Sequence, residues 1–276
     1  MSFLCGTRSG GKKYMNFFLA KKTLLYVLLS GHKYGHRIHS PFVYDLITTV
    51  FRAKPDKSQF KKIEKRRAEL KADNTEIEIQ DFGAGSVRNA SNVRKISYIA
   101  RTSLSQGKYA RLLFNLVNRY KPSTILELGT SLGISTAYLA TANPSARVMS
   151  LEGSPAIAAI ADKTMLDCSA GNVEIRVGNF NDTLSQALTD LQNVDFAFID
   201  GNHTKDATLR YFEQIYPYCT EQSILIFDDI SWSEGMREAW EQIAADQRIS
   251  ISIDLCKQGI VFFRKGIEKQ NFVVRY

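Results

Sequence analysis

Residues 125–135 read ILELGTSLGIS, and the interpretation of the whole chain starts from this stretch. The apolar run before the first glycine is typical of a buried strand, and GISTAYLATA (133–142) predicts a helix after it. In open α/β sheets, ligands bind beside such a strand–turn–helix, at the carboxyl ends of the strands. The segment therefore predicts a fold class and the place of a ligand together.

The remainder of residues 107–265 alternates between strand and helix patterns. Strands are expected at 123–129, 146–153, 173–178, 194–201, 223–229, 249–255 and 259–265. Helices are expected at 107–120, 133–142, 155–166, 182–191, 206–219 and 234–246. Apolar strands separated by helices indicate a parallel sheet buried on both faces, and the short last connection predicts a hairpin. We expect a doubly wound α/β fold: a mostly parallel seven-stranded sheet with a C-terminal antiparallel hairpin.

The first part of the chain differs in charge and pattern. Residues 1–75 hold 16 Lys and Arg against 5 Asp and Glu, whereas residues 76–276 hold 20 against 23. We expect a basic helical N-terminal extension or lid over 1–105 and a cofactor-binding domain over 106–276. Ser40 and Pro41 form a helix start, and 55–72 predicts a charged helix with an apolar stripe of Phe60, Ile63 and Leu70. Residues 76–104 are expected to be irregular.

A second glycine motif, DFGAGS at 81–86, competes for the cofactor. Its preceding segment EIEIQ alternates charged and apolar residues, as in a half-exposed edge strand. The residues after it are basic, and no acid follows about 20 residues on to hold a ribose. The motif is therefore interpreted first as a tight turn, with a lid or substrate wall, or a phosphate contact, as alternatives.

The turn at 129–133 favours a cofactor without a phosphate at that position. Ser131 replaces the second glycine of a dinucleotide fingerprint, and no P-loop lysine follows. Glu127 can address an ammonium group, and Ser135 with helix N–H groups can hold a carboxylate. Glu152, which ends the next strand, can accept both ribose hydroxyls. This description fits S-adenosylmethionine.

The ordered motifs resemble those of a known family. They are ELGTSLGIST (127–136), LEG (151–153), VGNF (177–180), FIDGNH (198–203) and FDD (227–229). Together they resemble class I S-adenosylmethionine-dependent methyltransferases, and within these the catechol and caffeoyl-CoA type O-methyltransferases. GHRIHSPFVYDL (35–46) also resembles the N-terminal signature of methyltransferase-like proteins of Bacteroidetes bacteria.

The resemblance implies a role for particular residues. The methionine end of the cofactor would contact the first motif, Glu152 with Gly153 the ribose, and the residues after the third strand the adenine. The implied cofactor-binding set is Glu127, Gly129, Thr130, Ser131, Gly133, Ser135, Glu152, Gly153, Asn179 and Phe180.

The same branch implies a divalent metal and a base. The metal ligands would be Asp200, Asp228 and Asp229, and they would suit Mg²⁺ or another divalent cation. Asp229 stands where the family has Asn, so a different ion or an unloaded site stays open, as does a role of both acids in capping the turn. His203, or Lys205, would take the acceptor proton, and His203 as a loop-ordering residue is the alternative. Asp200 belongs to both the metal and the catalytic set.

Two further features have competing interpretations. His32, His36 and His39 invite a zinc site, but glycines and a proline interrupt any helix that would align them, so a lid over the cleft is favoured. Trp232 is expected either to line the acceptor site or to pack in the core.

We expect methyl transfer to a hydroxyl oxygen of a small molecule. The alternatives are an RNA methyltransferase that uses the basic N-terminal segment, and a non-catalytic cofactor-binding protein docked on a membrane surface. Lys21 and Lys22 divide the apolar run at 17–29, so no integral membrane span is expected. Four scattered cysteines fit a cytoplasmic protein, and a homodimer is compatible with the sequence.

Overall fold

The computed structural model describes residues 26, 38–79 and 92–276. DFGAGS, His32 and His36 lie outside the described residues, as does most of the N-terminal apolar run. His39 is described and is exposed.

The main sheet confirms the expected fold class. Its strands are β3 (Thr124–Leu128), β4 (Arg147–Glu152), β5 (Val173–Val177), β6 (Val194–Ile199), β7 (Cys219–Phe227), β8 (Ile251–Asp254), β9 (Gly259–Phe262) and β10 (Gln270–Val273). Their order is β10-β8-β9-β7-β6-β3-β4-β5. The pairs from β5 to β7 are parallel, and β9 pairs antiparallel with both β7 and β8. The sequence predicted the first seven strands, and β10 adds an eighth, parallel to β8.

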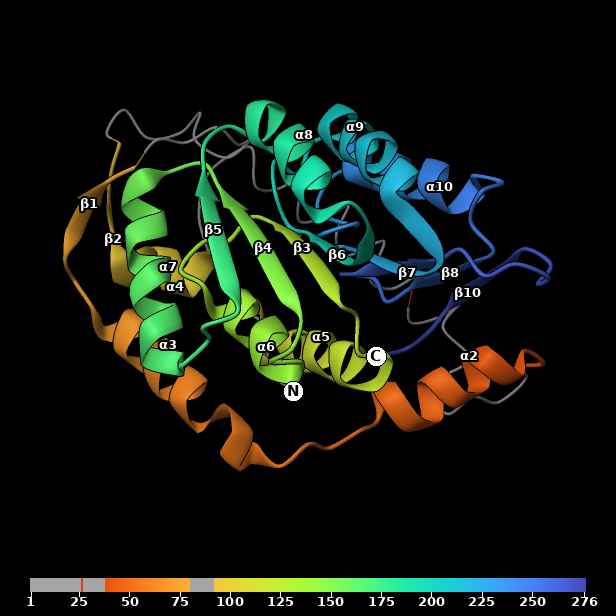
Figure 1. Ribbon diagram of the computed structural model, residues 1–276, viewed down its shortest axis with the longest axis horizontal. Helices are drawn as coiled ribbons and strands as arrows, with labels where there is room; N and C mark the ends of the chain where they lie inside the picture. Colours follow the sequence, from red (N-terminus) through yellow and green to blue (C-terminus); the bar gives the residue numbers. More distant parts are fainter. Residues whose placement is uncertain (1–25, 27–37, 80–91) are drawn as a thin grey trace.

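Helices cover both faces of this sheet. They are α5 (Gly107–Tyr120), α6 (Ile134–Ala142), α7 (Pro155–Cys168), α8 (Phe180–Leu191), α9 (Lys205–Ile215) and α10 (Glu234–Ala245). Figure 1 shows α8, α9 and α10 on one side of the sheet, and α5 and α6 on the other. Successive residues of β3 alternate between two apolar cores: Ile125 packs on the side of α5 and α6, and Leu126 on the side of α8 and α9. Two buried faces explain the near-continuous apolar character of the central strands.

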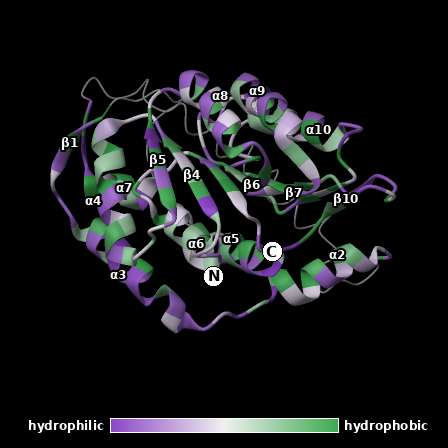
Figure 2. Cartoon of the chain, viewed as in Figure 1, coloured by the Kyte–Doolittle hydropathy of each residue, from purple (hydrophilic) through white to green (hydrophobic). Residues whose placement is uncertain are grey.

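The N-terminal elements pack onto the α5 side of the sheet. They are α2 (Pro41–Asp45), a π-helical segment (Leu46–Phe51), a 3₁₀ turn (Lys57–Phe60) and α3 (Lys61–Ala72). Ser40 caps α2 through Val43 N–H at 3.4 Å, with Pro41 at the first helical position, as predicted. Much of α3 is hydrophilic in Figure 2, yet Phe60, Ile63 and Leu70 are buried, which confirms the predicted stripe. The boundary at residue 105 remains a prediction, since α3 shares its core with α6 and α7.

Residues 76–102 contain more regular structure than expected. Strands β1 (Glu76–Glu78) and β2 (Val93–Lys95) form a separate antiparallel ribbon, and α4 (Ile96–Thr102) follows directly. The expectation of an irregular segment was therefore wrong at β2 and α4, because a strand of three residues and a helix of seven are too short for their periods to stand out. The segment before DFGAGS lies in this ribbon and not in the main sheet, and the partial exposure of β1 agrees with the predicted half-exposed edge strand.

Two further observations concern the described part of the chain. None of its helices combines the length and apolar character needed to cross a bilayer. Tyr26 is tied to the other end of the chain, because its hydroxyl donates to Val274 O at 2.7 Å and accepts from Tyr276 N–H at 3.0 Å.

Candidate active site

Main-chain hydrogen bonds bring the predicted site residues to one edge of the sheet. Gly129 N–H donates to Leu151 O at 2.9 Å, at the end of β4. Asp200 N–H donates to Leu128 O at 2.8 Å, and Asp228 N–H to Ile199 O at 2.9 Å. The residues that follow β3, β4, β6 and β7 are therefore neighbours in space, at the carboxyl ends of the strands.

The glycine turn after β3 needs both of its glycines. Gly129 has a φ of +100° and Gly133 a φ of +81°, a backbone conformation that residues with a side chain rarely adopt. A Cβ on Gly129 would overlap the main-chain carbonyl of Asp200, and one on Gly133 would lie 2.9 Å from Met165 Cε. Ser131 between them also has a positive φ, of 49°. The turn thus holds the start of α6 close against β6 and α7.

Glu127 is a fully buried acid at the end of β3. Its Oε2 accepts hydrogen bonds from Thr136 Oγ1 at 2.5 Å and Ser150 Oγ at 2.6 Å, and Ser150 also bonds Thr130 at 2.6 Å. Burial raises the pKa of Glu127 to about 7, against the lowering effect of these hydroxyl donors. Its Oε1 is buried and has no hydrogen bond of ordinary geometry among the described residues, although the nearby Ser135 hydroxyl also lowers the pKa of the carboxyl. This orphaned oxygen suits the ammonium group of an amino acid ligand.

Glu152 is held rigidly at the end of β4. Ser131 N–H donates to its Oε2 at 2.8 Å, and Ser154 N–H donates to its Oε1 at 3.0 Å. These bonds join the first two motifs, which lie 21 residues apart in the sequence. Gly153 follows directly in the same loop.

Asn179 and Phe180 lie next to Glu152, because Gly178 N–H donates to Glu152 O at 2.9 Å. Asn179 caps α8 by accepting from Asn181 N–H at 2.9 Å. The Phe180 ring packs against Gly201, where a Cβ would collide with it, and lies 6.0 Å from the Tyr211 ring. The described structure therefore brings the expected ribose and adenine residues together.

Asp200 and His203 face each other after β6. His203 Nε2 lies 3.6 Å from Asp200 Oδ1, and their side chains are 31% and 16% exposed. Burial, and then the neighbouring Asp228 and Asp229, raise the pKa of Asp200 well above its usual value. Lys205 points elsewhere, since its ammonium lies 2.6 Å from Glu238 Oε2 on α10. Of the two expected bases, His203 is the one that lies beside Asp200.

The acids after β7 contact a lysine that the sequence analysis did not single out. Lys257 Nζ lies 3.1 Å from Asp228 Oδ2 and 3.4 Å from Asp229 Oδ1. Burial, and then Asp229, raise the pKa of Asp228. Burial tends to lower the pKa of Lys257, but Asp228, Asp229 and Asp200 together raise it above its usual value. The lysine is therefore a permanent cation at neutral pH.

These residues do not fit the expected metal site well. Asp200, His203 and Asp229 have potential ligand atoms within 4.8 Å of one another, but this set omits Asp228. One oxygen of each acid, Asp228 Oδ2 and Asp229 Oδ1, already faces the Lys257 ammonium, whereas Asp228 Oδ1 is buried with no hydrogen-bond partner among the described residues. A divalent cation about 4 Å from that ammonium would be repelled by about 8 kcal/mol at an effective dielectric constant of about 20. With the Lys257 ammonium beside these carboxylates, a divalent ion between Asp228 and Asp229 is unfavourable.

Two aromatic residues adjoin this cluster. The Lys257 ammonium lies 5.8 Å from the centre of the Tyr109 ring, near the start of α5. Trp232, after β7, is 48% exposed, so of its two predicted roles the one in the core is wrong. Trp240 on α10 is the buried tryptophan instead.

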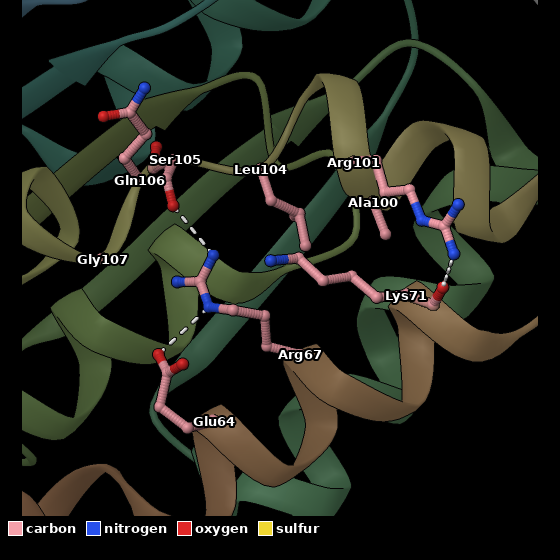
Figure 3. A pocket seen from close by; sticks show the side chains of 9 residues that line it. All are labelled: Glu64, Arg67, Lys71, Ala100, Arg101, Leu104, Ser105, Gln106 and Gly107. Carbon is pink, nitrogen blue, oxygen red and sulfur yellow. Dashed lines mark hydrogen bonds and ion pairs between the residues drawn. The ribbon is translucent and has the colours of Figure 1, made fainter. Parts of the chain in front are cut away.

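A cavity of about 360 Å³ lies between α3, α4 and the start of α5. Figure 3 shows Arg67 and Lys71 of α3 reaching toward residues 104–107, whereas Arg101 turns back to the main-chain carbonyl of Lys71. Arg67 Nη1 donates to Ser105 O at 2.8 Å and its Nε to Glu64 Oε1 at 3.1 Å. The N-terminal region therefore builds a basic cavity, which the motif-based analysis did not reveal.

The fold and the candidate site describe a class of protein: an open α/β sheet with a glycine turn and two buried acids, Glu127 and Glu152, at the carboxyl ends of its strands. Comparisons agree with this class. Residues 126–230 match a family described as methyltransferase domain. No curated protein matches the sequence.

Solved structures share the fold at low identity. An O-methyltransferase from Bacillus cereus in complex with S-adenosylhomocysteine is 20% identical, with a TM-score of 0.55, and the match covers 86% of this chain and 99% of that one. A methyltransferase from Podospora anserina bound to S-adenosylhomocysteine is 14% identical, with a TM-score of 0.58 and coverage of 95% and 100%. A structure from Staphylococcus aureus, described as a caffeoyl-CoA O-methyltransferase, is 17% identical, with a TM-score of 0.54 and coverage of 60% and 88%.

Residues 126–230 thus match a methyltransferase domain, and the fold is that of methyltransferases solved with S-adenosylhomocysteine, the product form of S-adenosylmethionine. The site is consistent with that cofactor, because Glu127 has an orphaned oxygen and Gly129 leaves no room for a side chain beside the turn. The assignment of individual cofactor contacts remains a prediction.

Proposed function

We propose that the protein methylates a hydroxyl oxygen of a small molecule. The observation that carries this proposal is the pair Asp200 and His203, 3.6 Å apart after β6 and one strand away from Glu127. The O-methyltransferase descriptions of distant structural neighbours support it.

Each residue at this edge of the sheet would have a separate role in the reaction. Glu127 would hold the ammonium of the bound cofactor, and Glu152 its ribose. When bound, S-adenosylmethionine supplies an electrophilic methyl carbon. The acceptor oxygen loses its proton as the new C–O bond forms and the C–S bond breaks, and His203 would receive that proton. Asp200 would keep the imidazole turned toward the acceptor.

Lys205 as the base is the less favoured assignment, because Glu238 already engages its ammonium. The residue beside the acidic loop favours one class of acceptor. Trp232, close to Asp229, offers an exposed aromatic surface on which an aromatic acceptor would stack. An aromatic hydroxyl compound is therefore the first class to test.

The test is transfer of a radiolabelled methyl group from S-adenosylmethionine to a panel of catechols, phenols and aliphatic alcohols, with bulk RNA as a separate arm. His203→Ala should lower turnover about 10²- to 10⁴-fold, the usual range for losing a general base. Asp200→Asn should also lower turnover while S-adenosylhomocysteine binding persists.

Asp206→Asn is the matched control, because this exposed acid lies in the first turn of α9 and should leave turnover unchanged. Methylation of RNA but of no hydroxyl compound would contradict the proposal. So would full activity in the His203→Ala and Asp200→Asn variants.

A further inference from the structure

Lys257 is fixed beside the acidic loop by its main chain. It lies in the turn between β8 and β9, where Leu255 N–H donates to Gln258 O at 2.8 Å. Ile230 N–H, just after Asp228 and Asp229, donates to Lys257 O at 3.0 Å. The main chain of Lys257 is therefore held next to the acids, so the position of its ammonium does not depend on the side-chain rotamer alone.

The side chain then returns to the carboxylates. It is 27% exposed, and its ammonium contacts Asp228 Oδ2 and Asp229 Oδ1 at 3.1 and 3.4 Å. Asp228 is almost completely buried, with its side chain 3% exposed. Burying a carboxylate requires a positive partner, and Lys257 provides one from within the chain.

We propose that the Lys257 ammonium takes the place of a divalent cation in the acidic cluster of Asp200, Asp228 and Asp229. An ammonium has three N–H donors, and two acids use two of them. The third would be left for an acceptor oxygen, which is the interaction that a metal would otherwise make. This last step rests on the proposed function, whereas the exclusion of the metal does not.

The consequence is a protein that needs no divalent cation. Lysine differs from a metal in carrying a single charge on a flexible stem, so the cluster keeps a net negative charge. Removing the lysine while keeping the acids should convert the cluster into an ion site, because the carboxylate oxygens and the His203 nitrogen then remain without a competing cation.

The experiment is a titration of metal-free protein with Mn²⁺, followed by electron paramagnetic resonance, with and without S-adenosylhomocysteine. Wild type and Lys257→Arg should show no site with a Kd below about 1 mM, and EDTA should not change S-adenosylhomocysteine affinity. Lys257→Met should gain one Mn²⁺ site, at least about tenfold tighter, and Asp229→Asn in that background should remove it. Lys269→Met, which removes a partly buried lysine elsewhere, should gain none.

A Mn²⁺ site in wild type with a Kd in the micromolar range, abolished by Asp229→Asn, would overturn the proposal. This part of the experiment does not need the Lys257 variants to fold. A folded Lys257→Met protein that binds no Mn²⁺ would overturn it as well. Failure of every variant to bind S-adenosylhomocysteine would instead count against the proposed function, and the Mn²⁺ result would stand separately.

Discussion

Glu127 should make the stability of the protein depend on pH in a definite direction. Its carboxyl is fully buried, and burial raises its pKa from 4.5 to about 7. Between these pH values the folded protein keeps a proton that the unfolded chain has lost. The free energy of unfolding therefore falls as pH rises through this window, and the full penalty is present above pH 7. A displacement of this size corresponds to about 3 kcal/mol.

Glu127→Gln removes this penalty without changing the shape of the side chain. The amide oxygen can still accept from Thr136 and Ser150, which both donate to Glu127 Oε2. Replacing the orphaned Oε1 by an amide NH₂ adds a cost of about 1–3 kcal/mol that does not vary with pH. The difference in unfolding free energy between the variant and wild type should therefore grow by about 3 kcal/mol from pH 4.5 to pH 8.

The assay is urea unfolding of both proteins at closely spaced pH values, with tryptophan fluorescence as the probe. Thr136→Val is the companion variant: it removes one donor to the carboxylate and should raise the pKa of Glu127 further. A pH-independent difference between wild type and Glu127→Gln would refute the reasoning. It would mean that Glu127 ionises in the folded state as easily as in water.

Three further outcomes follow from single contacts. Gly129→Ala should abolish S-adenosylhomocysteine binding in calorimetry and cost at least about 2 kcal/mol, because its Cβ would overlap the Asp200 carbonyl at a φ of +100°. Asp195→Ala should lower the free energy of urea unfolding by about 1–3 kcal/mol, because its carboxylate accepts from Ser123 and Thr124 N–H at the start of β3. Arg248→Ala should lower the free energy of unfolding by about 1–3 kcal/mol, because the guanidinium is only 31% exposed, pairs with both Glu213 and Asp246, and lies 4.4 Å from the centre of the Tyr216 ring.

The sequence predicted the sheet and the edge that carries the candidate site, because both follow from local patterns. Apolar strands give the elements, and parallel strands place all their carboxyl ends together. It did not predict the order of the strands. The segment 173–178 looked like a buried strand, yet β5 is the edge of the sheet and Val177 is 46% exposed. Helix α8 starts at Phe180 rather than 182, because Asn179 caps it.

Site residues were predictable where a side chain directly follows a strand. Asp200, Asp228 and Asp229 meet this condition, and the structure brings their side chains into one cluster. Lys205 also lies close to β6 in sequence, but a helix begins there and turns its side chain toward α10. Distance along the chain alone does not decide which of two nearby bases faces the site.

Lys257 could be predicted as a site residue only from the pairing of the strands, not from a local sequence pattern. It lies in a turn, and turns carry lysine for solubility far more often than for chemistry. Because β9 runs antiparallel to β7, however, Gly259 at its start pairs with Phe227 at the end of β7. The turn before Gly259 must then lie beside the acids that follow Phe227. Once the hairpin is paired with β7 rather than with the other edge of the sheet, a cation in LCKQG has two carboxylates as its nearest charged neighbours. A polar turn in an antiparallel hairpin should therefore be included among candidate site residues whenever its strand pairs with the last parallel strand of the sheet.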